Sequence, residues 1–294
     1  MSVATWTDKD SYRLDLELAK KGVAQHARAD HVAMEILGPE YVIGAGGNPQ
    51  VEEIQADYAR LFPGAEKTWP GMGTGLVASV DQVRMVTVPV VFGTCTVSVH
   101  EGLGFSSHGE FASWCRQDQG IALKVAFSFA DIFDLTYGRD EVARSSPDAI
   151  EMWTLALSHL EVTTNGIIGG FDLAALTQSI CMTVELSLKA ALTYLEVTEK
   201  ELRAIGHNNA ESAKLLASLK PHRDDPLIER LVHRLPPYVG SRYKRAELNR
   251  LQMIDLALAS QFIASSTMRR LTGRDFAKMI ENEEGPNARH RLFD

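Results

Sequence analysis

The most regular hydrophobic pattern in the chain lies between Asp172 and Glu196. Its apolar residues recur at steps of three and four positions, which places their side chains on one face of an α-helix. They are Leu173, Leu176, Ile180, Val184, Leu188, Leu192 and Leu195. The opposite side carries small residues such as Ala174 and Cys181, so other helices can approach closely. The pattern predicts a central helix packed on several sides, with Glu185 and Lys189 as an exposed i, i+4 ion pair.

Helical patterns dominate the chain on both sides of this stretch from about residue 147 onward. A first helix is expected after Ser146-Pro147, because proline suits the first helical turn, and it should end in the loop NGIIGG at 165–170. A break is expected at Ile205-Gly206, and a helix after Asn208, with Glu211 at capping-box spacing. A short helix is expected at 226–235. A long last helix is expected at 246–271, with Arg269 and Arg270 in its final turn and Gly273 just past it.

The first half of the chain mixes helical and strand-like patterns. Helices are expected over 10–37, with a break near Gly22, over 49–61 after an Asn48 cap, and over 106–116. The Val- and Thr-rich segment 82–100 predicts a hairpin that turns near Gly93, and the alternation at 121–129 predicts another strand. The glycine-rich run GMGTG at 71–75 is expected to be a loop.

Together these patterns predict an α+β protein of two domains. Residues 1–140 would form a mixed α+β domain of unknown role, and residues 147–273 an all-helical bundle. The polar segment YGRDEVARSS at 137–146 is the expected boundary, and residues 274–294 the expected polar tail. At 294 residues the chain is long enough for two such cores.

Composition indicates a soluble intracellular protein. The chain is 45% hydrophobic and 23% charged, and no apolar stretch is long enough to cross a bilayer, so no membrane partner is expected. The N-terminal residues show neither a basic leader nor an apolar run. Three scattered cysteines do not suggest a disulfide framework or a zinc cluster. We therefore expect a cytoplasmic protein without a metal or cofactor.

The net charge of −8 is unevenly distributed. Residues 1–150 hold 12 Lys and Arg against 20 Asp and Glu, whereas the remainder holds 18 of each. Residues 220–250 hold eight basic against four acidic residues, a local balance of +4. This cluster favours contact with RNA or nucleotide phosphates, and its tyrosines could stack on bases. An ordinary solvated helix surface is the open alternative. The candidate binding residues are Lys220, Arg223, Arg242, Tyr243, Lys244 and Arg245.

Other short motifs give weaker evidence for a functional site. The GAGG run at 44–47 lacks the third glycine of a dinucleotide-binding loop, and GMGTG lacks the lysine of a phosphate-binding loop. His100, His108 and Cys115 lie close in sequence with Glu101 and Glu110, but such groups arise by chance at junctions between elements. We predict no metal site or nucleophile there.

The region from about 150 to 273 resembles the HEPN domain, the nucleotide-binding helical bundle of higher eukaryotes and prokaryotes. The similar features occur in the same order and at similar spacing, and they cover somewhat under half of the chain. They are Trp153 in the first helix, the run Glu185-Leu-Ser-Leu-Lys189-Ala-Ala-Leu192, the turn Ile205-Gly-His-Asn208, Leu215-Leu216, and Pro236-Pro-Tyr-Val-Gly-Ser-Arg-Tyr243 before a long closing helix.

The resemblance implies a bundle of four to five helices that binds nucleotides or RNA and commonly forms a homodimer. Some members are ribonucleases of toxin–antitoxin or antiphage systems, in which four to six residues lie between an arginine and a histidine. Here Arg203 and His207 are the candidates, with only three residues between them. We therefore expect phosphate binding with weak or no cleavage. A ribonuclease effector and a dimeric adaptor without a nucleic-acid ligand are the alternatives, and the N-terminal domain could have a protein partner.

Overall fold

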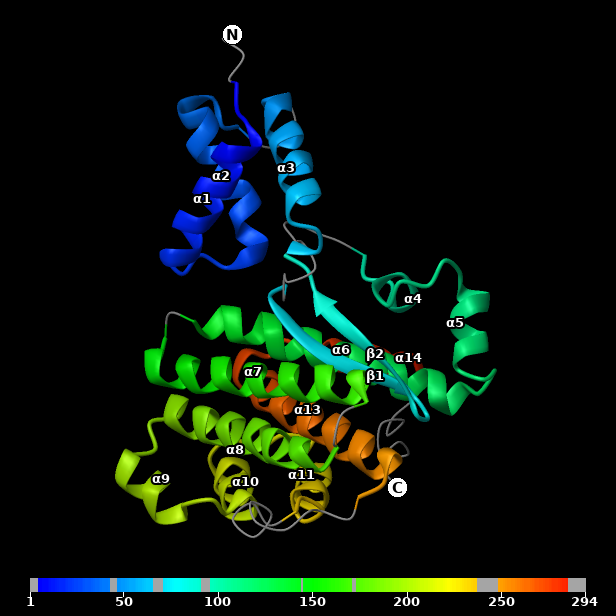
Figure 1. Ribbon diagram of the computed structural model, residues 1–294. Helices are drawn as coiled ribbons and strands as arrows, with labels where there is room; N and C mark the ends of the chain where they lie inside the picture. The colour runs from blue at the N-terminus through cyan, green and yellow to red at the C-terminus, as the bar shows by residue number, and fades with distance from the viewer. Residues whose placement is uncertain are drawn as a thin grey trace. The chain divides into compact units, whose positions relative to one another are not determined.

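The computed structural model describes residues 5–42, 47–65, 71–90, 96–143, 145–170, 173–236 and 248–284. Its contacts divide the chain into two compact units, Met1–Pro70 and Gly71–Asp294. The described residues are mostly helical, with one two-stranded sheet among them (Figure 1). This confirms a mainly helical α+β protein. The units divide far from the boundary expected at 137–146.

The described part of the first unit contains helices only. Helix α1 (Asp8–Lys20) ends before Gly22, whose φ of 76° confirms the expected break. Helix α2 (Arg28–Leu37) follows, and α3 (Pro49–Leu61) begins after Asn48, whose side chain accepts a hydrogen bond from the Gln50 backbone N–H. Buried residues of all three helices, among them Leu18, Val32 and Ile54, form one small core.

The second unit begins with an antiparallel hairpin. Strand β1 (Gly73–Ser79) pairs with β2 (Gln82–Val88) in a register that joins Gly73 to Val88 and Ser79 to Gln82. The predicted strand at the start of 82–100 is therefore confirmed, but its predicted partner is wrong. The partner is the segment that contains GMGTG, and the residues after position 98 begin a short helix, α4 (Val99–Gly102).

The glycines of GMGTG allow β1 to lie directly on the helices beneath it. A Cβ atom on Gly73 would lie 2.5 Å from Thr136 Oγ1, and one on Gly75 would lie 2.9 Å from Ile132 and would also overlap Gln261. Glycine weakens a strand in isolation, which is why the sequence predicted a loop. Here close packing against the helices offsets that cost, and every residue of β1 is buried.

The structure corrects two predictions before residue 147, the strand at 121–129 and the start of the domain boundary at 137–146. The short helix expected over 106–116 is confirmed as α5 (His108–Trp114), but the strand expected over 121–129 is wrong. These residues open α6 (Gln119–Val142), a helix of 24 residues that also contains the first part of the expected boundary. Nearly all residues of α6 between Val125 and Thr136 are buried, so this helix lacks the polar face that would have revealed a helical period.

The remaining helices largely follow the predicted order. The loop predicted at 165–170 is wrong, because the helix continues to Gly169 and ends at Gly170 in the left-handed conformation. Part of the predicted polar tail is also helical. These helices are α7 (Pro147–Gly169), α8 (Leu176–Tyr194), α9 (Glu199–Ile205), α10 (Asn209–Leu219), α11 (Asp225–Val232), α13 (Arg250–Thr272) and α14 (Phe276–Glu284).

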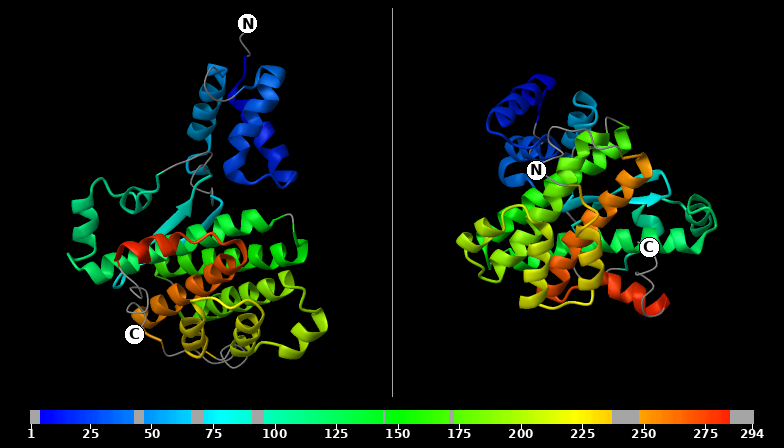
Figure 2. Two further views of the ribbon diagram at one scale, coloured as in Figure 1. Left: turned by 180° about the vertical axis from the view of Figure 1, so that it is seen from behind. Right: turned by 90° about the horizontal axis from the view of Figure 1, so that it is seen from below.

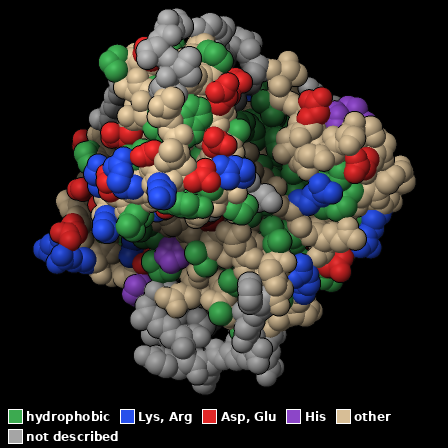
Figure 3. All heavy atoms as spheres, turned by 45° about the horizontal axis from the view of Figure 1, so that its top comes forward, with side chains coloured by type: hydrophobic (Ala, Val, Ile, Leu, Met, Phe, Trp, Pro, Cys, Tyr) green, Lys and Arg blue, Asp and Glu red, His purple; other side chains and the backbone are tan. Residues whose placement is uncertain are grey.

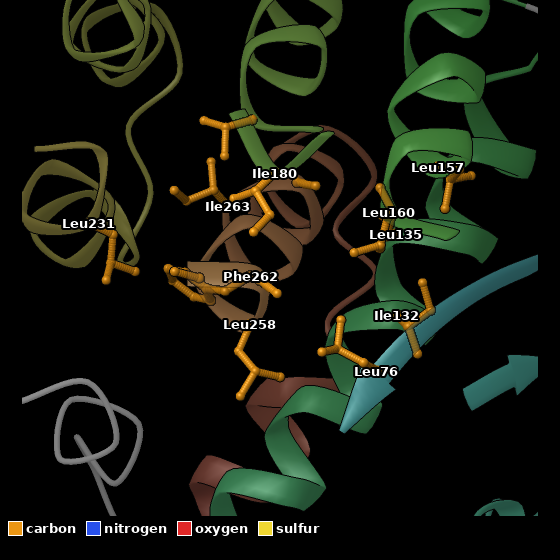
Figure 4. Close-up of a cluster of buried hydrophobic side chains, with 14 of the residues drawn as sticks. Leu76, Ile132, Leu135, Leu157, Leu160, Ile180, Leu231, Leu258, Phe262 and Ile263 are labelled. Carbon is orange, nitrogen blue, oxygen red and sulfur yellow. The ribbon is translucent and has the colours of Figure 1, made fainter. Parts of the chain in front are cut away.

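One hydrophobic core joins the hairpin to the helices of the second unit. Helix α8 contacts α7, α10 and α13, which confirms the predicted central helix. Leu76 of β1, Ile132 of α6 and Phe262 of α13 belong to the same core as the side chains of α7 and α8 (Figure 4). Helix α14 packs along α6 (Figure 2). The helices after residue 147 therefore share their core with the hairpin and α6.

Candidate site around Glu185 and His207

A sharp turn between α9 and α10 positions His207. Gly206 ends α9 with a φ of 62°, a conformation that costs glycine little. Asn208 then caps α10 by accepting a hydrogen bond from the Glu211 backbone N–H. This confirms the predicted break and cap. His207 thus lies between two capped helix ends, and its ring turns toward α8.

Glu185 of α8 is the partner of that ring, and its environment differs from the prediction. Its side chain is 6% exposed rather than solvated. Lys189 Nζ donates to Glu185 Oε1 at 2.8 Å, as the i, i+4 spacing predicted. His207 Nδ1 lies 2.9 Å from each carboxylate oxygen. The buried carboxylate is therefore satisfied by an ammonium group and an imidazole at once.

This contact fixes the orientation of the His207 ring and the role of each of its nitrogens. An ionised carboxylate only accepts hydrogen bonds, so Nδ1 carries a proton and Nε2 lies on the opposite edge of the ring. The His207 side chain is 50% exposed. In the neutral ring Nε2 accepts a hydrogen bond from a ligand, and in the protonated ring it donates one to an anion. The site thus presents an oriented imidazole.

Arg203 has a different environment. Its guanidinium forms an ion pair with Glu199 at 2.6 Å, one turn earlier on α9. The two side chains are 76% and 78% exposed. Because such exposed pairs contribute only about 0.3–0.5 kcal/mol, the pair leaves Arg203 weakly held. The structure therefore orients His207 on a buried partner, whereas the ion-pair partner of Arg203 is exposed.

The predicted basic cluster is only partly within the described residues. Arg223 forms ion pairs with Asp275 and with Glu281, so its charge is already compensated. Lys220 is exposed, and its backbone carbonyl accepts a hydrogen bond from Arg270. On the face shown in Figure 3, basic and acidic side chains are interspersed. The other candidates, Arg242, Tyr243, Lys244 and Arg245, lie outside the described residues.

The sequence patterns missed a buried ionic cluster around Arg269. Its side chain is fully buried and forms ion pairs with Asp131 and Asp134 of α6 and with Asp224. Burial raises the pKa of Asp134, and the Arg269 guanidinium opposes that rise. Two aspartates three positions apart in the largely apolar middle of α6 were the available signal. The cluster joins α6, α13 and the residue that precedes α11.

The remaining candidates are histidines with local contacts and buried cysteines. The His100 and His108 rings lie 3.8 Å apart, and His100 Nδ1 is 2.7 Å from Ser98 Oγ. Burial raises the pKa of the Cys115 thiol, and burial followed by the nearby Glu185 raises that of Cys181 to about 11. No group of three or more metal-ligating side chains occurs within the described ranges. Most of the GAGG run lies outside them.

Comparison with family models, curated proteins and solved structures gave no match to this chain. These comparisons leave the HEPN resemblance untested. Among the helices that the structure describes, none combines the length and the apolar character needed to cross a membrane.

Proposed function

We propose that this protein binds the phosphate of a nucleotide or of RNA at the helical face around His207. The observation that carries the proposal is the buried Glu185 carboxylate, which lies 2.9 Å from His207 Nδ1 and so orients an imidazole whose side chain is half exposed. Protonated imidazole donates charge-assisted hydrogen bonds to phosphate. The HEPN resemblance supports the ligand class, because nucleotide and RNA binding are what it implies.

We further propose that cleavage of RNA is weak or does not occur. Acid–base cleavage requires the histidine and a cation preorganised at the same phosphate. His207 is held by a buried partner, whereas Arg203 is directed to Glu199 on the surface of α9. A binding surface tolerates a cation that orders only when the ligand arrives, at a cost in affinity. A cation that is not held in place before the ligand binds lowers the rate of cleavage more than it lowers the affinity.

One observation favours the competing ribonuclease function. A histidine whose Nδ1 is held by a carboxylate is the arrangement in which imidazole acts as a general base through Nε2. The Glu185–His207 pair has this form. The adaptor alternative requires neither binding nor cleavage, so one set of assays separates all three functions.

The experiment measures binding and cleavage of a labelled single-stranded RNA. Fluorescence anisotropy of the wild type should show binding that weakens steeply with added salt. His207→Ala should weaken it about tenfold, as expected for a lost charged hydrogen bond. His31→Ala changes an exposed histidine of the first unit and serves as the matched control. The predicted contribution of Arg242, Lys244 and Arg245 is tested by changing all three to Glu.

Each alternative has its own outcome. Absence of RNA and nucleotide binding would leave the adaptor function. Metal-independent cleavage by the wild type that both Arg203→Ala and His207→Ala abolish would establish the ribonuclease. Binding that is equal in the wild type and His207→Ala would exclude the site proposed here.

A further inference from the structure

A hollow with a volume of about 600 Å³ lies between α10 and α11. Asn208, the residue that follows His207 in the sequence, is one of the residues that line it. Its volume falls in the range of small-molecule sites, about 300–1,000 Å³.

The hollow has an apolar floor. Ala213 of α10 and Ile228 and Val232 of α11 line it, and each of these side chains is buried. The small side chains of Ala210 and Ala217 also line it from α10. A surface made of methyl groups and aliphatic side chains suits the flat face of an aromatic base, which loses water when it lies there.

Two opposite charges in the lining remain available to a ligand. Asp225 accepts a hydrogen bond from Arg270, and Glu211 accepts one from Asn208. In contrast, the side chains of Lys214 of α10 and Glu229 of α11 form no ion pair or hydrogen bond within the part of the chain that the structure describes. The hollow is therefore flanked by a donor-only ammonium on one helix and an acceptor-only carboxylate on the other.

This pair of charges discriminates among nucleobases. Guanine presents two adjacent donors, N1–H and the N2 amino group, which one carboxylate can accept together. Guanine also presents the acceptors O6 and N7, which suit a lysine. Adenine places an acceptor, N1, beside its amino group, and uracil has a single ring donor between two acceptors. A carboxylate would meet a lone pair on either of these bases.

We infer that the hollow binds a guanine base, with Glu229 accepting from N1–H and the N2 amino group and Lys214 donating to O6 or N7. The inference rests on the proposed function, because the phosphate of the same ligand would lie at the His207 face. It adds base specificity to that function, and it assigns the specificity to two residues that make no contact with the phosphate.

The test measures the affinities of the four ribonucleoside 5′-monophosphates by calorimetry. The wild type should bind GMP about 5- to 100-fold more tightly than AMP, the range expected for one good bidentate base contact. Glu229→Gln should reduce this ratio to near one, because an amide pairs a donor with an acceptor. Lys214→Met should also reduce it. Glu151→Gln, an exposed glutamate of α7, is the matched control and should leave the ratio unchanged.

The failure of this inference differs from the failure of the proposed function. His207→Ala should weaken all four nucleotides by a similar factor and leave the GMP-to-AMP ratio intact. Equal binding of the four nucleotides, a preference for another base, or a guanine preference that survives Glu229→Gln would each overturn the guanine site alone. Absence of binding by every nucleotide and by RNA would overturn both. Because Lys214 and Glu229 are exposed, the variants should fold, which circular dichroism checks.

Discussion

Replacement of Arg269 by methionine should destabilise the second unit severely and in a pH-dependent manner. The guanidinium is fully buried between Asp131, Asp134 and Asp224, whose side chains are 3%, 1% and 4% exposed. Methionine fills much of the same space but carries no charge. The substitution therefore leaves three carboxylates of the core without their common cation, which is the costly way to change a buried ion pair.

The size of the destabilisation follows from the hydrogen bonds and charged neighbours that each carboxylate retains. Asp134 still accepts hydrogen bonds from the backbone N–H groups of Phe276 and Ala277, and Asp224 still has His222 and Arg223 as neighbours. The lost compensation thus amounts to about one carboxylate. Protonating one aspartate at pH 7 costs about 4 kcal/mol, given an unperturbed pKa near 3.9. That value agrees with the roughly 3–5 kcal/mol seen when one partner of a buried pair is removed.

The same reasoning gives the sign of the pH effect. Burial already raises the pKa of Asp134 in the folded protein. A raised folded-state pKa means that the native state binds the proton more tightly than the unfolded state, so this contribution to stability is lost as pH rises. Without Arg269 the strongest opposition to this rise in pKa is lost, and the backbone N–H of Phe276 still opposes it. The destabilisation by Arg269→Met should therefore shrink to about 1.5 kcal/mol at pH 5, where protonation costs less.

Urea unfolding followed by far-ultraviolet circular dichroism at pH 7 and pH 5 provides the measurement. Arg270→Met is the matched control, because Arg270 is also buried but pairs with a single aspartate, Asp225, that is 22% exposed. It should cost less than Arg269→Met and depend less on pH. A loss below about 1 kcal/mol for Arg269→Met at pH 7, or an equal loss at both pH values, would refute the reasoning.

Two further predictions concern close packing and burial in the second unit. Gly75→Ala should destabilise the protein by about 1–3 kcal/mol in urea unfolding, because the new methyl group would overlap Ile132 and Gln261. Gly109→Ala is the control and should not destabilise the protein, because its Cβ would lie 3.8 Å from the nearest atom, Ser107 Oγ. In the native protein Cys181 should resist iodoacetamide at pH 8, because it is buried and its pKa is about 11, and urea should expose it to labelling. Labelling of that peptide in the native state would contradict this.

Local sequence signals predicted several helix ends correctly, because caps and breaks depend on neighbouring residues, although the loop predicted at 165–170 was wrong. Asn48, Gly206, Asn208 and Gly273 each act at the predicted place. The predictions for strands failed for a tertiary reason. The pairing of β2 with β1 depends on glycines that allow β1 to pack closely against α6 and α13. These contacts are between segments far apart in the chain, so no local sequence pattern predicts them.

Burial of charge was the other property that the sequence did not reveal. Arg269 looked like a last-turn arginine at the end of a long helix, a position that normally favours a solvated cation. Glu185 and Lys189 looked like an exposed pair. In both cases the partner that explains the burial comes from a distant part of the chain, such as Asp131 for Arg269 and His207 for Glu185. The i, i+4 spacing predicted the pairing of Glu185 with Lys189 but not its environment.

The contrast between His207 and Arg203 follows from the elements that hold them. Glu185 lies on α8, which packs against α7, α10 and α13, so the position of its carboxylate is fixed by the core of the second unit. Helix α9, which carries Arg203, has seven residues, and Leu202 is its one buried side chain. A helix so weakly anchored orders its surface side chains poorly. The core thus preorganises the imidazole and not the guanidinium, which is the physical reason to expect binding rather than cleavage at this face.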